Sequence, residues 1–224
     1  MQNLPDAILL VGPTGSGKTP LGQVLEARGL GGRPCAHFDF GEEIRSAVAS
    51  GGQTANLFAP ELDVLRQSLA TGALLEDEQF PIARRILQAF LENRDTYHFP
   101  RRKMVSVPVF PWVVLNGLPR HAGQAEAMAA QVRVQAVVEL DCNAAAVAAR
   151  IRADAGGDRA GRVDDDTEGV RRKLDTYALR TAPLVDYYRR QGAAVITIPV
   201  GPTTSAEECR RKIGTLTVFR GGKW

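Results

Sequence analysis

The residues best suited to chemistry in this chain form one glycine-rich run close to its beginning. The run reads GPTGSGKT, so that Gly12 is followed after four residues by Gly17, Lys18 and Thr19. Glycines allow the backbone to curl until successive N–H groups face a single anion, and a helix that starts at the end of the run adds its positive N-terminal pole. The spacing is that of a P-loop, which predicts a cradle for the phosphates of a nucleoside triphosphate.

The side chains of the P-loop have separate predicted tasks. Lys18 reaches the β- and γ-phosphates, and the hydroxyl of Thr19 is a ligand for Mg²⁺, directly or through a water molecule. A glycine-rich turn that bound nothing would need neither a lysine nor a threonine at these positions. The residues assigned to nucleoside triphosphate binding are Gly12, Pro13, Thr14, Gly15, Ser16, Gly17, Lys18 and Thr19.

Five short apolar runs are the elements that must position this loop, and they cover residues 7–11, 36–40, 112–115, 136–140 and 194–198. Because these runs are apolar on both faces, they are predicted as buried parallel strands. Helical patterns separate them, for example over residues 81–91 and 170–188. Strands that alternate with helices indicate an α/β fold with a doubly wound, five-stranded parallel sheet.

Two stretches interrupt this alternation. Residues 50–60 (SGGQTANLFAP) are rich in turn formers, and residues 154–166 (DAGGDRAGRVDDD) are polar and dense in both charges. Neither stretch is expected to contribute to the core. Loops of this kind in α/β proteins often cover the carboxyl ends of the strands, where ligands bind, so the second stretch is a candidate lid.

The composition excludes several classes of protein. The 28 basic and 25 acidic residues give a net charge of +3, too small to attract nucleic acid or a membrane through the field of the whole molecule. Anion binding must therefore be local. Aromatic residues make up 6% of the chain, which disfavours a stacking platform for single-stranded nucleic acid. Of the basic residues 23 are arginines, a bias that genome base composition explains, and Lys18 is the one lysine before Lys103.

Cysteine usage and the N-terminal segment indicate the compartment. The cysteines, Cys35, Cys142 and Cys209, are odd in number and form no CxxC pair, which argues for a reducing environment and against a disulfide framework or a zinc site. The first residues lack a basic segment, and the apolar run ILLV is too short for a signal peptide or a membrane span. A cytoplasmic location is expected.

Further short motifs follow the P-loop in order. They are FGEEIR (40–45), TGALLED (71–77), NGLPRHAGQ (116–124), RI (150–151), GRVDD (161–165) and KLDTYALRTAPLVDYY (173–188). With this order and spacing, the chain resembles the nucleoside monophosphate kinases, and most closely the adenylate kinases with a short lid. The resemblance implies a P-loop core (1–40, 77–149 and 167–224), a helical insertion that binds the nucleoside monophosphate (41–76), and a lid (150–166).

The resemblance also implies an acceptor site. Arg45 and Arg120 are implied to hold the monophosphate group, and a guanidinium group is suited to this because it offers a phosphate two parallel hydrogen bonds. Leu75 is implied to lend the adenine a backbone contact, and the amide of Gln124 to read the adenine edge with one donor and one acceptor. The full set of implied acceptor residues is Gly41, Arg45, Leu75, Gly117, Arg120 and Gln124.

On the donor side, Arg150 at the stem of the lid is implied to stack on the adenine of ATP, and Arg162 to contact the transferring phosphoryl group. Such arginines bring positive charge to the transition state and keep water out when the lid closes. The implied catalytic residues are Lys18, Arg120, Arg159, Arg162 and Lys173. The implied reaction is direct in-line transfer from Mg·ATP to AMP, giving two ADP, in a monomer with no nucleic-acid or membrane partner.

Three positions depart from the family pattern. Asn116 stands where the family carries the Asp that orders the water shell of Mg²⁺, so Asn116 is expected to contact the metal only through water, and a weaker magnesium dependence or a slower rate is predicted. Asp154 stands where a second lid arginine is expected, and Arg159 is the replacement that the spacing favours. Lys173 replaces an arginine, keeping the charge and losing the planar fork.

Two alternatives remain open at this point. The acceptor of the phosphoryl group is AMP or another nucleoside monophosphate such as UMP or CMP, because the extra length after Arg45 reshapes the acceptor pocket. The second alternative is a nucleotide-binding regulatory module with weak or lost activity, which the three departures favour. The basic residues at Arg45, Arg120 and Arg162 oppose it, since a protein that only binds ATP needs no arginines on the acceptor side.

Overall fold

Parallel strands form the centre of the molecule, as the apolar runs predict. The computed structural model describes residues 4–93, 111–157 and 167–219. Within these residues a five-stranded sheet contains β1 (Asp6–Val11), β2 (Cys35–Asp39), β3 (Trp112–Asn116), β4 (Arg133–Asp141) and β5 (Ala194–Pro199), in the order β2-β3-β1-β4-β5. Every neighbouring pair is parallel, which confirms the predicted α/β fold.

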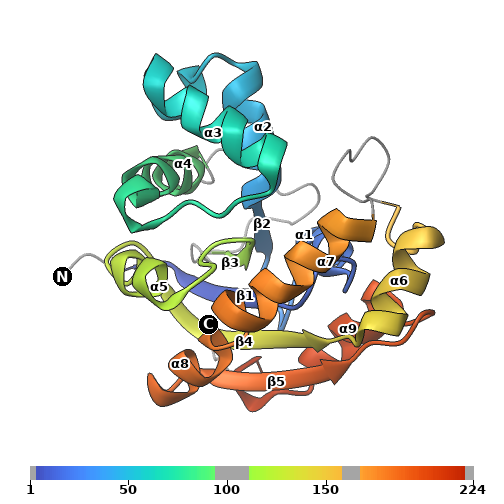
Figure 1. The fold of residues 1–224 in the computed structure, drawn as a ribbon. Coiled ribbons are helices and arrows are strands. Elements are labelled where there is room, and N and C mark those ends of the chain that lie inside the picture. The colour runs from blue at the N-terminus through green and yellow to red at the C-terminus, as the bar shows by residue number, and fades with distance from the viewer. Residues whose placement is uncertain (1–3, 94–110, 158–166, 220–224) are drawn as a thin grey trace.

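Helices cover both faces of this sheet (Figure 1). The α-helices are α1 (Lys18–Arg28), α2 (Phe40–Ala49), α3 (Ala59–Thr71), α4 (Phe80–Asn93), α5 (Ala122–Met128), α6 (Ala144–Arg152), α7 (Thr167–Thr176), α8 (Leu184–Arg190) and α9 (Ala206–Ile213). Successive residues of a strand point to opposite faces, so Ile8 packs in one hydrophobic cluster with α1, α6 and α9, and Leu9 packs in a second with α4, α5 and α8. The central strands β1 and β3 are therefore buried on both sides, whereas the edge strand β5 is partly exposed, so the prediction of a buried strand over 194–198 is wrong for Thr197.

The helix expected over 170–188 is not continuous. Helix α7 ends at Thr176, a turn of π-helix spans Tyr177–Thr181, and α8 begins at Leu184. Pro183 lies between the last two elements and has no N–H group to donate, which interrupts the hydrogen bonds of an α-helix. The N–H of Ala182 donates instead to the carbonyl of Tyr177, five residues back, at 2.8 Å. By contrast, the helix predicted over 81–91 is confirmed as α4.

Helices α2 and α3 stand away from the sheet beside α4 (Figure 1). The prediction that residues 50–60 stay out of the core is wrong, because Ala55 and Leu57 are buried in the cluster that contains α4. The turn that carries them closes when the N–H of Leu57 donates to the carbonyl of Gly52 at 3.0 Å. Gly52 has a φ of 84°, which favours glycine at this position. Of the second interruption, residues 158–166 lie outside the described structure.

The three cysteines are free and buried. Burial raises the pKa of the Cys35 thiol to about 12. Among the helices that the structure describes, none combines the length and the apolar character needed to cross a membrane.

Candidate active site

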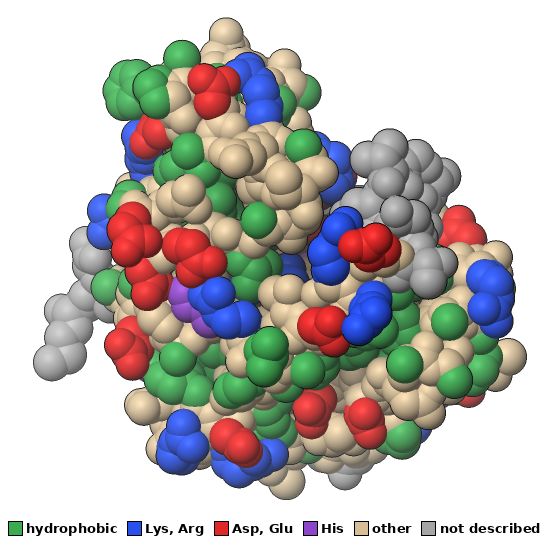
Figure 2. All heavy atoms as spheres, viewed as in Figure 1, with side chains coloured by type: hydrophobic (Ala, Val, Ile, Leu, Met, Phe, Trp, Pro, Cys, Tyr) green, Lys and Arg blue, Asp and Glu red, His purple; other side chains and the backbone are tan. Residues whose placement is uncertain are grey.

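The carboxyl ends of β1, β2 and β3 open into a crevice bounded on its far side by α2 and α3. Its surface is hollowed between the regions of α3 and α7 (Figure 2). The residues that line it come from the P-loop, the ends of β2 and β3, the predicted insertion, the loop after β3, α5, α7 and the π-helical turn. They are Gly12, Thr14, Gly15, Gly17, Lys18, Thr19, Asp39, Phe40, Gly41, Ile44, Arg45, Ser68, Leu69, Gly72, Ala73, Leu74, Leu75, Asn116, Gly117, Arg120, Gln124, Lys173 and Tyr177.

The P-loop connects β1 to α1 in a conformation that needs its glycines. Gly15 and Gly17 have φ values of 74° and 96°, which side chains rarely tolerate. A Cβ atom on Gly12 would lie 2.9 Å from the carbonyl oxygen of Leu140 in the neighbouring strand. Ser16 is buried, and its hydroxyl has no hydrogen-bond partner among the described residues. The loop is thus closely packed, and Gly12, Gly15 and Gly17 border the crevice while Ser16 is turned into the protein.

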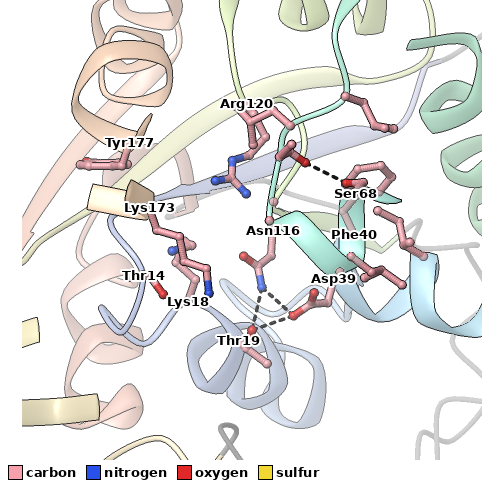
Figure 3. Close-up of a pocket in the computed structure, with 18 of the residues that line it drawn as sticks. Thr14, Lys18, Thr19, Asp39, Phe40, Ser68, Asn116, Arg120, Lys173 and Tyr177 are labelled. Carbon is pink, nitrogen blue, oxygen red and sulfur yellow. Dashed lines mark hydrogen bonds between the residues drawn. The ribbon is translucent and has the colours of Figure 1, made fainter. Parts of the chain in front are cut away.

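Lys18 is folded back over the loop. Its ammonium group donates hydrogen bonds to the carbonyl oxygens of Gly12 at 2.7 Å and Pro13 at 2.8 Å. Its nitrogen, like that of Lys173 on α7, lies at the pocket (Figure 3). Two ammonium groups that are far apart in the sequence therefore face the same pocket.

Three polar side chains meet beside the P-loop (Figure 3). The hydroxyl of Thr19 donates to the carboxylate of Asp39 at 2.6 Å. The amide nitrogen of Asn116 donates to the same carboxylate oxygen at 2.8 Å and to the Thr19 hydroxyl at 3.0 Å. Asp39 and Asn116 end their strands directly opposite each other in the sheet. Sequence reasoning missed Asp39, although an acidic residue near the end of the predicted strand run 36–40, directly before FGEEIR, was a usable signal.

Arg120 lies at the end of the loop after β3, and its guanidinium group points into the pocket (Figure 3). The backbone around it is fixed, because the Thr181 hydroxyl donates to its carbonyl oxygen at 2.9 Å. In the part of the chain that the structure describes, no carboxylate pairs with its side chain. Burial lowers the pKa of this guanidinium from its ordinary value. A desolvated positive charge of this kind favours an anion in the crevice.

Arg45 reaches the same pocket from α2 and already has an anionic partner. Its guanidinium contacts the carboxylate of Glu42, one turn earlier, with distances of 2.7 and 3.1 Å. Both side chains are at least half exposed, so this ion pair stabilises the fold very little. A phosphate group at the pocket would therefore displace Glu42 at small cost.

Leu75 and Gln124, the two residues implied to contact an adenine, are hydrogen-bonded to each other. The buried amide of Gln124 donates to the carbonyl of Leu75 at 2.7 Å and accepts a hydrogen bond from the backbone N–H of Arg120 at 2.8 Å. The extended segment before α4 is thereby held against the loop after β3. Gly41 and Gly117 line the same pocket. The structure brings the implied acceptor residues together, and their roles stay predictions.

The structure gives Arg150 contacts that the sequence did not predict. It is buried, and its guanidinium donates to the carbonyl oxygens of Gly15 at 3.0 Å, Gly201 at 3.0 Å and Thr204 at 2.9 Å. Arg150 therefore ties the P-loop to the loop after β5. These bonds fix the plane of the guanidinium group, and stacking on an adenine stays a prediction. Asp154 is exposed just after α6.

Arg159 and Arg162, together with most of the predicted lid, lie outside the described residues. Of the residues predicted to be catalytic, Lys18, Arg120 and Lys173 are brought to one pocket. A P-loop lies on one side of the crevice, and on the other lies an arginine with no carboxylate partner among the described residues; together they define a phosphotransferase of the P-loop class.

Comparison with known proteins gives the particular family. No family model matches the chain. The adenylate kinase of Stenotrophomonas maltophilia (strain R551-3) is 30% identical over 209 residues, which cover 89% of this chain and 94% of the relative. That of Xanthomonas oryzae pv. oryzae (strain MAFF 311018) is 30% identical over 92% of this chain and 97% of its own length. That of Synechococcus sp. (strain CC9902) is 26% identical over 94% and 97%. The chain belongs to the adenylate kinase family.

Proposed function

We propose that this protein transfers the terminal phosphoryl group of Mg·ATP directly to AMP, giving two molecules of ADP. The observation that carries the proposal is the pair of facing cationic sites in one crevice. The P-loop with Lys18 is proposed to face the donor, and the guanidinium of Arg120, which has no carboxylate partner among the described residues, is proposed to face the acceptor. An ATPase that used water as the acceptor would need no second anion site.

On the donor side, the proposed ligands of ATP are the P-loop residues Gly12–Thr19, with Arg150 behind the loop. Successive N–H groups of the loop face the phosphates, and Lys18 exchanges its bonds to two backbone carbonyls for bonds to phosphate oxygens. The hydroxyl of Thr19 and the oxygen atoms that surround it suit Mg²⁺, a cation that prefers oxygen ligands. When bound, the metal neutralises charge on the β- and γ-phosphates.

On the acceptor side, Arg45 and Arg120 are proposed to hold the phosphate of AMP in line with the γ-phosphate. Gly41 and Gly117 leave space for that phosphate, and Leu75 and Gln124 border the base. The side-chain amide of Gln124 makes two hydrogen bonds within the protein, which leave it one further N–H to donate and one further oxygen lone pair to accept with. An amide with both kinds of group suits adenine, which supports AMP over UMP or CMP.

Positioning and positive charge supply the rate, because phosphoryl transfer needs little covalent help from the protein. Lys18, Arg120 and Lys173 are proposed to surround the transferring group, and Arg159 and Arg162 to join them. The proposed division is a core (1–40, 77–149 and 167–224), an acceptor-binding insertion (41–76) and a lid (150–166). We propose a monomer in the cytoplasm, and the three free, buried cysteines support a reducing compartment.

The test is a coupled assay of ADP formation from Mg·ATP with AMP, UMP and CMP in turn, and with no acceptor. AMP should give the highest kcat/KM, and ATP should not be hydrolysed when the acceptor is left out. Highest turnover with UMP or CMP would reassign the acceptor. ATP binding by calorimetry without turnover of any acceptor would contradict the enzyme proposal and favour a regulatory module.

A further inference from the structure

At the ends of β2 and β3, the negative charge lies on β2, whereas the family pattern implies a negative charge on β3. That pattern has a carboxylate at the end of β3, where this chain has the neutral Asn116. In the sheet Asn116 stands directly opposite Asp39, and its amide nitrogen donates to the Asp39 carboxylate at 2.8 Å. The carboxylate missing from β3 is thus present on β2, one hydrogen bond away.

The residue types at these two positions depend on each other. Two carboxylates at this distance would repel, and one of them would be driven to take up a proton. An amide beside a carboxylate instead donates a hydrogen bond and leaves the full charge on its neighbour. A neutral residue at position 116 is therefore the partner that a carboxylate at position 39 requires.

We propose that Asp39 is the carboxylate of the magnesium site and that Asn116 is the residue that positions it. The proposal rests on the proposed function, since it concerns the metal ion that accompanies the triphosphate. It replaces the interpretation of Asn116 as a lost magnesium residue. Under this proposal, the carboxylate that the family pattern places on β3 is found on β2 instead, and it serves the same metal ion.

The geometry around Asp39 supports this role in two ways. The Thr19 hydroxyl donates its proton to Asp39 at 2.6 Å and accepts from Asn116 at 3.0 Å, so one lone pair of the hydroxyl oxygen remains for a metal ion or its water. The second Asp39 oxygen accepts a hydrogen bond from the N–H of Glu42 at 3.3 Å, which orients the carboxylate before any ligand arrives. Mg²⁺ is commonly bound by one or two carboxylates together with the phosphates of the substrate.

Asp39 also has a structural role, which the experiment must separate from metal binding. It is the N-cap residue of α2, since it accepts the hydrogen bond from Glu42 N–H. Asparagine caps helices as well as aspartate does. Asp39→Asn therefore keeps an oxygen for the cap and nearly the same shape while removing the charge, and it places an amide nitrogen where an oxygen accepted from Thr19 and Asn116. Glu43→Gln, four residues along on the same helix and absent from the pocket lining, is the matched control.

The experiment measures metal and nucleotide binding without an acceptor. Mn²⁺ is titrated into the protein saturated with ATP, and free Mn²⁺ is counted by electron paramagnetic resonance. ATP binding is measured in parallel by calorimetry with a chelator present. Asp39→Asn should weaken Mn²⁺ binding about tenfold to a hundredfold and leave metal-free ATP binding unchanged, since removal of a supporting carboxylate has effects of that size. Glu43→Gln should match the wild type.

The charge-swap variant Asp39→Asn/Asn116→Asp keeps the test decisive even where a single variant folds poorly. It returns the carboxylate to β3 and should restore most of the lost Mn²⁺ affinity. An unchanged Mn²⁺ affinity in Asp39→Asn, or no recovery in the charge swap, would overturn the proposal. Because no acceptor is present, a failure of the AMP assay leaves this result standing, and the two proposals fail separately.

Discussion

On the proposed triphosphate side of the crevice, Lys18, Thr19 and Arg150 are held by backbone carbonyls and by side chains at strand ends. On the proposed acceptor side, Arg45 is held by an exposed glutamate, and Arg120 has no carboxylate partner in the described residues. Hydrogen bonds within a buried network are costly to lose, whereas exposed ion pairs exchange partners easily. We infer that the proposed donor site is built in advance and that the proposed acceptor site is completed by its ligand.

The sharpest test of the donor side is Lys18→Ala. Removing the ammonium group should lower kcat/KM about a thousandfold, because no other described side chain is held over the loop in its place. Stability should change little, since the two hydrogen bonds of Lys18 join it only to residues of its own loop. The coupled assay and thermal melts measure both effects, with exposed Lys212→Ala on α9 as the control. Activity within tenfold of the wild type would argue against the P-loop as the catalytic cradle.

On the acceptor side, Arg120→Ala should lower kcat/KM for AMP about a hundredfold and leave ATP affinity unchanged. It should not destabilise the protein, because it removes a desolvated charge that has no carboxylate partner in the described structure. Exposed Arg190→Ala on α8 is the control. Equal losses of ATP and AMP affinity would show that Arg120 does not belong to one side of the crevice.

Arg150→Ala tests whether the donor site depends on its scaffold. The change removes hydrogen bonds to the carbonyls of Gly15, Gly201 and Thr204, so the free energy of unfolding should fall by about 2–3 kcal/mol. The KM for ATP should rise because the loop loses its support. Chemical denaturation and kinetics measure the two effects. The control is Arg152→Ala, two residues on and exposed. A rise in KM with full stability would instead favour the stacking role implied by the family resemblance.

Gln124→Ala probes the contact between the insertion and the loop after β3. It leaves the carbonyl of Leu75 and the N–H of Arg120 without their partner, which should cost about 1–3 kcal/mol. The KM for AMP should rise about tenfold while the KM for ATP stays unchanged. Exposed Gln191→Ala after α8 serves as the control. If AMP kinetics stay normal in a destabilised variant, Gln124 acts only as a structural tie.

The donor side was largely predictable from the sequence, because a P-loop and an apolar strand are local patterns. The run 7–11 corresponds to β1, and Lys18 opens α1 directly after the loop. The contacts that complete the site join distant parts of the chain. Asn116 meets Asp39 across 77 positions, and Gln124 meets Leu75 across 49. Such pairs follow from the strand order and its register, which composition and periodicity do not specify.

The burial of Ala55 and Leu57 was missed for a related reason. A segment rich in turn formers is typical of a surface loop, yet here two of its apolar residues, Ala55 and Leu57, pack in the cluster that contains residues of α2 and α4. At Ala55 and Leu57 the tertiary contacts therefore determine the local structure. The π-helical turn at Tyr177–Thr181 has a local cause instead, the missing N–H of Pro183, which the helical periodicity of the segment did not reveal.

The smallest expected effect belongs to the Arg45–Glu42 ion pair, and it tests the idea that the acceptor completes its own site. Glu42→Gln removes the carboxylate that competes with a phosphate for Arg45. An exposed pair contributes at most about 1 kcal/mol, so the KM for AMP should fall by no more than about fivefold, with little change in stability. Asp63→Asn breaks the equivalent pair with Arg66 on α3, which does not line the pocket, and should leave the KM unchanged. Because salt screens exposed charges, the difference between the two variants should shrink at high ionic strength. A rise in the KM for AMP in Glu42→Gln would mean that Glu42 orients Arg45 for the phosphate, and the acceptor side would then be preformed like the donor side.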